Sequence, residues 1–248
     1  LICIIAGIGA GVGTGFAGMS AAAVISPMLI TFLGMDPYLA VGIALASDVL
    51  ASAASAVTYG KNKNLDIKNG LIMMASVLCF TAVGSFVASV VPKTAMGNFS
   101  VIMTLLLGVK FIVKPVVAPK RRLTEATTAQ KAVRSVLCGS AVGFICGFVG
   151  AGGGMMMLLV LTSVLGYELK TAVGTSVFIM SITALTGSVS HFVIGGLPNT
   201  EALIICIVST LAAAQLSAVF ANKASPKTLN RITGAILVAL GIAVLVVN

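Results

Sequence analysis

Apolar segments of about the length needed to cross a bilayer follow one another along nearly the whole chain, with short polar stretches between them. Hydrophobic residues make up 58% of the 248 residues and charged residues only 8%, far from the averages of soluble proteins. A spanning helix needs about 20 mostly apolar residues, which leaves room for about eight full or partial crossings. The sequence therefore predicts an all-α polytopic membrane protein surrounded by a lipid bilayer, with no soluble domain of appreciable size.

An internal repeat with an offset of 132 residues organises the chain. Six glycines align at this offset without a gap, which indicates a duplication. Short motifs align as well: Ala40-Val41-Gly42 with Ala172-Val173-Gly174, and Tyr59 with His191. We expect a first repeat (1–114), a basic linker (115–134) and a second repeat (135–248), which together form one transmembrane domain.

Each repeat is expected to begin with a Gly-rich segment, residues 1–34 and 135–166, that is too long for one crossing and too short for two. A broken or re-entrant pair of short helices fits this length. Three transmembrane helices should follow in each repeat, near 38–59, 69–91 and 95–114, and near 170–194, 201–221 and 229–247. Residues 1–5 lie inside an apolar run without a basic region or cleavage site, so we expect no signal peptide.

The basic residues lie between the apolar segments, and the formal net charge is +9. Lys and Arg concentrate in cytoplasmic loops of membrane proteins. The basic loops fall on one side only if each Gly-rich segment enters and leaves on the same side. The two repeats then have inverted topology, with the linker in the cytoplasm and both termini outside. We expect a multi-pass protein of the cytoplasmic (inner) membrane and no nucleic-acid partner, because the basic residues form no aromatic-bearing face.

Broken helices that meet near the membrane midplane are typical of transporters, and their N-termini offer free N–H groups to anions. The Gly-rich breaks and the start of the following helix therefore supply candidate contacts to a small anionic substrate. The candidate substrate-binding residues are Gly18, Ser20, Gly150, Gly152, Gly153, Gly154, Thr175 and Ser176. The alternatives are that these glycines serve helix packing alone and that the hydroxyls bond to their own backbone.

Asp48, His191 and Gln215 are the candidates for ion coupling or gating. Asp48 lies about ten residues into its helix, near the bilayer centre, where a carboxyl group marks a proton or cation step or ties two helices together. His191 lies near the outer end of its helix, and Gln215 lies within an apolar helix. The cysteines have no metal-ligand spacing, and we expect no metal and no cofactor.

The second repeat carries Gly147-Phe148-Val149-Gly150-Ala151-Gly152-Gly153-Gly154, followed by Ala172-Val173-Gly174-Thr175-Ser176. With these motifs the chain resembles the TauE/SafE anion permeases over nearly its whole length. In the first repeat Ile43-Ala44 stand where Thr-Ser is typical of the family. The resemblance implies transport of small sulfur-containing anions such as sulfite, sulfoacetate or other organosulfonates, often as an export step.

Export of an anion needs no coupling ion, because an inside-negative potential favours its exit, whereas uptake would need one. The alternative class is an anion channel or membrane scaffold without carrier activity. An enzyme is disfavoured because the sequence shows no nucleophile and base pair and no nucleotide-binding motif, and Cys146 lies in an apolar setting. A homodimer remains an open alternative to a monomer.

Overall fold

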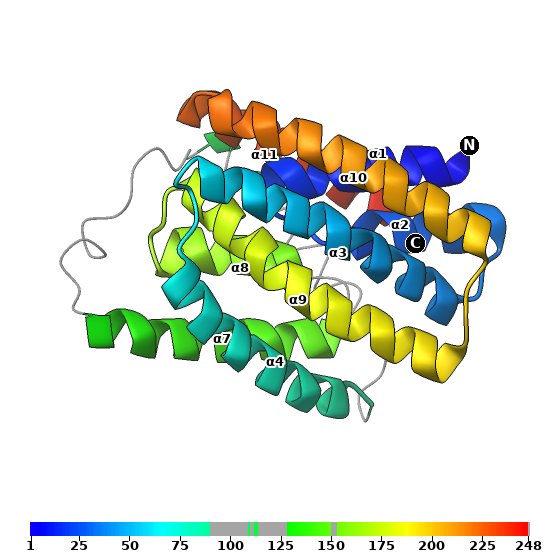
Figure 1. The fold of residues 1–248 in the computed structure, drawn as a ribbon, viewed down its shortest axis with the longest axis horizontal. Coiled ribbons are helices and arrows are strands. Elements are labelled where there is room, and N and C mark those ends of the chain that lie inside the picture. Colours follow the sequence, from blue (N-terminus) through cyan, green and yellow to red (C-terminus); the bar gives the residue numbers. More distant parts are fainter. Residues whose placement is uncertain (90–108, 110–111, 114–127, 150–152, 248) are drawn as a thin grey trace.

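The computed structural model describes residues 1–89, 109, 112–113, 128–149 and 153–247 (Figure 1). Within these ranges all regular structure is helical, which confirms the predicted all-α class. The helices are α1 (Ile2–Ala17), α2 (Ala22–Leu33), α3 (Pro37–Lys61), α4 (Ile67–Ser89), α7 (Thr128–Val149), α8 (Gly153–Leu159), the π-helix η1 (Val160–Val164), α9 (Leu169–Gly195), α10 (Thr200–Lys223) and α11 (Pro226–Val247).

Long apolar helices dominate the described part of the chain. Three of them are long and apolar enough to cross a membrane, at Leu39–Lys61, Leu169–Val193 and Thr200–Lys223. The two helices of the first Gly-rich segment are shorter, with 16 and 12 residues. At 1.5 Å per residue they span about 24 and 18 Å, less than the hydrocarbon thickness of about 30 Å. Neither α1 nor α2 is long enough to cross a bilayer alone.

Glycines let helices of different repeats approach closely. Gly7, Gly11 and Gly15 lie on the face of α1 that packs against α10, and a Cβ on Gly15 would lie 2.5 Å from Ser217 Cβ. Gly139, at the position equivalent to Gly7, packs in the same way against α4, where a Cβ would lie 2.7 Å from the Met73 carbonyl oxygen. The first helix of each repeat thus packs against a helix of the other repeat.

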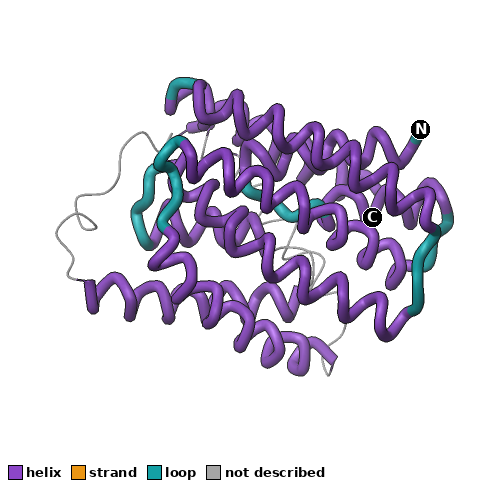
Figure 2. The backbone as a smooth tube through the Cα atoms, in the orientation of Figure 1, coloured by secondary structure: helices purple, strands orange, loops and turns teal. Residues whose placement is uncertain are grey.

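The pair α3 and α9 lies between these contacts and runs antiparallel, as the labels and sequence colours of Figure 1 show for the same view of the backbone as in Figure 2. Near one end Gly42 of α3 packs against His191 of α9, and near the other Gly174 of α9 packs against Tyr59 of α3. These two contacts join equivalent positions, because Gly42 aligns with Gly174 and Tyr59 aligns with His191 at the 132-residue offset. The same contact is therefore made twice, with the repeats exchanged.

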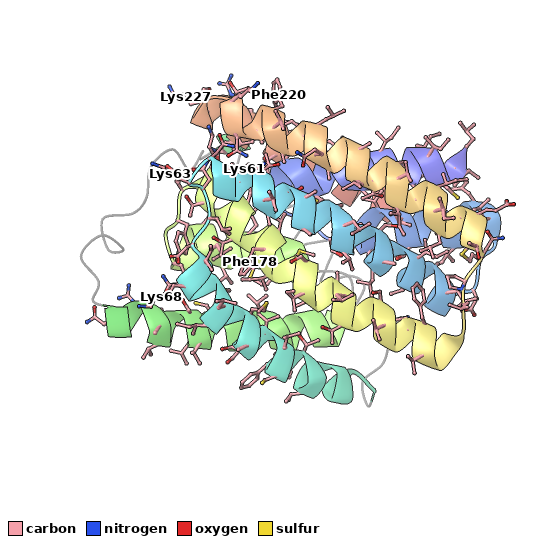
Figure 3. All side chains as sticks on the ribbon, in the orientation of Figure 1. Lys61, Lys63, Lys68, Phe178, Phe220 and Lys227 are labelled. Atoms are coloured by element: carbon pink, nitrogen blue, oxygen red, sulfur yellow. The ribbon has the colours of Figure 1, made fainter. Side chains whose placement is uncertain are left out.

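Basic side chains gather at one end of the helical bundle. Lys61, Lys63, Lys68 and Lys227 lie there together (Figure 3), and the Lys170 ammonium donates a hydrogen bond to the Asn222 carbonyl oxygen at the same end, 2.7 Å away. Helix α1 begins at the opposite end (Figure 1). Basic residues that lie between different apolar segments of the sequence thus come together at one end of the bundle.

The observed helix boundaries differ from the expected ones mainly at α7. This helix begins at Thr128, inside the segment expected to be linker. Its first two turns, Thr128 to Arg134, are polar but helical. The other long helices that the structure describes begin and end within a few residues of the expected boundaries. Nearly all of the helix expected at 95–114 and most of the linker lie outside the described residues.

Candidate functional site

The first Gly-rich segment breaks at Gly18, between α1 and α2. Gly18 has φ 60° and ψ 37°, a left-handed conformation that costs glycine little and other residues more. Its N–H donates to the Thr14 carbonyl oxygen at 2.9 Å, and the Thr14 hydroxyl in turn donates to the Met19 carbonyl oxygen at 3.0 Å. The Ser20 hydroxyl accepts a hydrogen bond from the Ala22 N–H at 3.3 Å. The break is therefore a fixed turn whose polar groups are largely paired within the chain.

Helix α8 of the second repeat begins against this break. A Cβ on Gly154 would lie 2.7 Å from the Gly18 carbonyl oxygen and 2.7 Å from the Ser20 amide nitrogen. From α9, the Ser176 hydroxyl donates to the Gly18 carbonyl oxygen at 3.0 Å. Four of the candidate residues, Gly18, Ser20, Gly154 and Ser176, thus meet in one place, although they come from both repeats.

The remaining candidates of the Gly-rich segments have other positions. Thr175 is buried, but its hydroxyl accepts a hydrogen bond from the Asp66 N–H at 3.2 Å, so it holds the loop between α3 and α4 rather than facing the break. Gly153 is the first residue of α8. Gly150 and Gly152 lie outside the described residues.

Asp48 lies beside the break, on the buried face of α3. Its side chain is 0% exposed, and Ser52 Oγ donates to Asp48 Oδ1 at 2.8 Å. The Ser20 hydroxyl and the Ala21 amide lie near the same carboxyl group, but within the described part of the chain Oδ2 has no hydrogen-bonding partner. A carboxyl group of the first repeat thus lies at the start of α2.

His191 and Gln215 lie apart from this cluster. His191 is half-buried and packs against Gly42 near the end of the bundle opposite to the lysines. Gln215 Oε1 accepts a hydrogen bond from the Thr58 hydroxyl at 3.1 Å, which links α10 to α3. The structure therefore brings only Asp48, of the three coupling candidates, to the break.

A second polar network lies at the basic end of the bundle. The Tyr167 hydroxyl donates to Asp66 Oδ2 at 2.7 Å, and Asn64 Nδ2 donates to Asn222 Oδ1 at 2.7 Å. Burial of Tyr167 raises the pKa of its phenol, and the neighbouring Asp66 carboxyl group raises that pKa further. These bonds connect the loop between α3 and α4 to the loop before α9 and to α10 at this end of the bundle.

Two residues that support the break were not among the predicted site residues. The buried Tyr59 hydroxyl donates to the Gly15 carbonyl oxygen at 2.8 Å, and Met180 Sδ lies beside Gly154. A signal existed for both in the repeat alignment. Tyr59 aligns with His191, and Met180 aligns with Asp48 at the 132-residue offset.

The fold and the composition define a helical membrane protein, with buried polar groups gathered where two Gly-rich segments meet. Residues 3–244 match the family described as "Sulfite exporter TauE/SafE". The chain belongs to the TauE/SafE family, which confirms the resemblance seen in its motifs. It is therefore a membrane transporter and not an enzyme.

Similar proteins carry the same kind of description. The "Probable membrane transporter protein YunE" of Bacillus subtilis is 25% identical over 97% of this chain and 95% of that protein. The "Probable membrane transporter protein YdhB" of the same organism is 24% identical over 86% of each chain. A further probable membrane transporter, from Methanocaldococcus jannaschii, is 26% identical over 83% of this chain and 78% of its own length. No solved structure matches the chain.

Proposed function

We propose that this transporter carries small sulfur-containing anions, such as sulfite, sulfoacetate or another organosulfonate, across the cytoplasmic membrane by alternating access. Export is the proposed direction. The observation that carries the proposal is the meeting of the two Gly-rich segments, where Gly154 lies against the Gly18 carbonyl and the Ser20 amide. Substrate sites of transporters with inverted repeats lie at such junctions of interrupted helices.

The inverted topology of the two repeats is part of this proposal. It is supported by the contacts that recur with the repeats exchanged, such as Gly42 with His191 and Gly174 with Tyr59. A pair of elements that contact one another through equivalent residues is expected when two copies are related by a two-fold axis. The short lengths of α1 and α2 support a re-entrant pair for the first repeat.

The proposed orientation places the basic end of the bundle in the cytoplasm and both ends of the chain on the opposite side. It is supported by the position of Lys61, Lys63, Lys68 and Lys227 at one end (Figure 3), since Lys and Arg are retained on the cytoplasmic side. The Tyr167–Asp66 and Asn64–Asn222 hydrogen bonds at that end then form a closed cytoplasmic gate.

The proposed substrate contacts are backbone N–H groups and hydroxyls at the break. They suit an oxyanion because such donors bind several oxygens without contributing a fixed charge. Ser176 acts as a positioning residue in this arrangement, because its hydroxyl already donates to the Gly18 carbonyl. The alternative is an anion channel or a scaffold whose glycines serve only helix packing, and a homodimer is compatible with either reading.

The test is counterflow of radiolabelled sulfite and of a sulfonate in proteoliposomes, with sulfate, phosphate and a neutral amino acid as competitors. Saturable accumulation that only sulfur oxyanions compete for is expected from a carrier of this class. Flux that does not saturate and shows no counterflow would favour the channel. Absence of flux with every anion would favour the scaffold.

A further inference from the structure

Asp48 is a fully buried carboxylic acid whose hydrogen bonding is incomplete. Ser52 Oγ donates to Oδ1 at 2.8 Å, whereas Oδ2 has no partner among the described residues, and the side chain is 0% exposed. A buried carboxylate that lacks a compensating charge is strongly disfavoured. The site therefore requires either a cation or a proton.

Among the described residues, the helices packed against α3 supply no cation at this depth. These are α1, α2, α9 and α10. Their titratable side chains, with those of α3, are Cys3, Tyr38, Tyr59, Lys61, Lys170, His191, Glu201, Cys206 and Lys223. The three lysines lie in the last turns of α3 and α10 and in the first turn of α9. His191 packs against Gly42, about 9 Å along α3 from Asp48 at 1.5 Å per residue.

The start of α2 explains why the carboxyl group is at this position. The Ser20 hydroxyl and the Ala21 amide lie near it, and the Ser20 hydroxyl also accepts a hydrogen bond from the N–H of Ala22, the first residue of α2. A carboxylate beside a helix N-terminus is favoured by the helix dipole. The equivalent position of the second repeat is Met180, so this feature belongs to the first repeat alone.

We infer that Asp48 is a proton-binding site of the carrier, and that one proton crosses the membrane with each monovalent anion. The inference rests on the proposed function, because it places the substrate next to Ser20. An anion at that point and an ionised Asp48 share the same donors and repel one another. The Asp48 carboxylate therefore takes up a proton from water on the side where the anion enters, and the carboxylic acid releases it on the side where the anion leaves.

A proton fits this site better than a metal ion. The described residues contain no group of three or more His, Cys, Asp or Glu side chains that could hold a metal ion, and a single unpaired oxygen needs only one hydrogen. Cotransport of a proton with a monovalent anion moves no net charge. The membrane potential then no longer drives the flux, so export requires an outward anion gradient that exceeds the inward proton gradient.

The inference is tested with purified protein in proteoliposomes, using ethanesulfonate, whose charge does not change with pH, and sulfite as probes. A pH-sensitive dye in the lumen reports protons, and a potassium gradient with valinomycin sets the potential. Wild type should move one proton per ethanesulfonate at a rate that does not depend on potential. Asp48→Asn should lose proton movement and the response of counterflow to pH, while His191→Gln should keep both.

A second measurement does not depend on transport. Infrared difference spectra between acidic and alkaline samples should contain the band of a protonated carboxyl group that Asp48→Asn removes. Asp48→Ser, which is smaller and uncharged, serves for both measurements if the asparagine variant does not accumulate. Failure of wild type to exchange any anion would count against the proposed function alone, because the infrared band still decides the state of Asp48.

Several results would overturn the inference. The first is anion flux in wild type that moves no proton and follows the potential, and the second is flux that requires Na⁺ in place of protons. The third is loss of the pH response in His191→Gln and not in Asp48→Asn. The fourth is an infrared difference that Asp48→Asn leaves unchanged.

Discussion

Gly154→Ala tests whether transport depends on the close approach of the two Gly-rich segments. The added Cβ would lie 2.7 Å from the Gly18 carbonyl oxygen and from the Ser20 amide nitrogen, where ordinary contacts are 3.4 Å or more. Backbone atoms cannot rotate away as a side chain can, so α8 must retreat by about 0.7 Å, the difference between these two distances. Overpacking of this kind costs about 1–3 kcal/mol.

The expected result is a loss of transport in a folded protein. If the cost falls on the conformation that binds substrate, counterflow should decrease by about 5- to 150-fold. The rest of the bundle keeps its contacts, so helical content by circular dichroism should equal that of wild type. The assay is the initial rate of sulfite counterflow per reconstituted protein, measured over a range of concentrations.

Gly9→Ala is the matched control. It adds the same methyl group to a Gly-rich helix, but its Cβ would lie 3.5 Å from Val24 Cγ1, an ordinary contact. This variant should transport at the wild-type rate. Equal counterflow by Gly154→Ala and Gly9→Ala would refute the argument that the approach at Gly154 shapes the site.

Three further predictions concern orientation, positioning and the closed end. A single cysteine at Lys63 should react with a membrane-impermeant maleimide only from the cytoplasmic side and one at Leu197 only from outside; labelling of both from one side contradicts the orientation. Ser176→Ala removes the hydrogen bond to the Gly18 carbonyl. It should raise the half-saturating substrate concentration about 2- to 10-fold, for a loss of about 0.5–1.5 kcal/mol. Ser181→Ala should leave this concentration unchanged, because the Ser181 hydroxyl bonds within its own helix. Tyr167→Phe should open the basic end more readily, so the reactivity of a cysteine at Ala172, which is buried at this end, should rise. Unchanged reactivity would remove this bond from the gate.

Local features of the sequence were sufficient to predict where most of the helices lie. The limits of α3, α9 and α10 follow from apolar length and from polar residues at both ends, because in lipid a helix pairs its own backbone groups. The kink at Gly18 could also be predicted, since a glycine without a side chain to pack favours a break there. The start of α7 at Thr128 could not, because its first two turns are polar and look like linker.

The candidate site was only partly predictable. Ser176 and Thr175 are neighbours in one motif, yet the Ser176 hydroxyl bonds to the break while the Thr175 hydroxyl accepts from the Asp66 N–H. Successive residues of a helix point about 100° apart, so a motif alone does not decide which of them faces the site. Tyr59 was recognised only as the repeat partner of His191, and its bond to the Gly15 carbonyl spans elements whose packing no local pattern specifies.

The sequence by itself determined the lipid environment, the helices and the duplication. These depend on composition, on the spacing of apolar residues and on aligned glycines within one chain. Only the tertiary structure decided that Gly154 of one repeat lies against Ser20 of the other, and that the Asp48 carboxyl faces the start of α2. The reason is physical. Such contacts join residues more than a hundred positions apart or on separate helices, and their distances are set by the simultaneous packing of several helices rather than by any one segment.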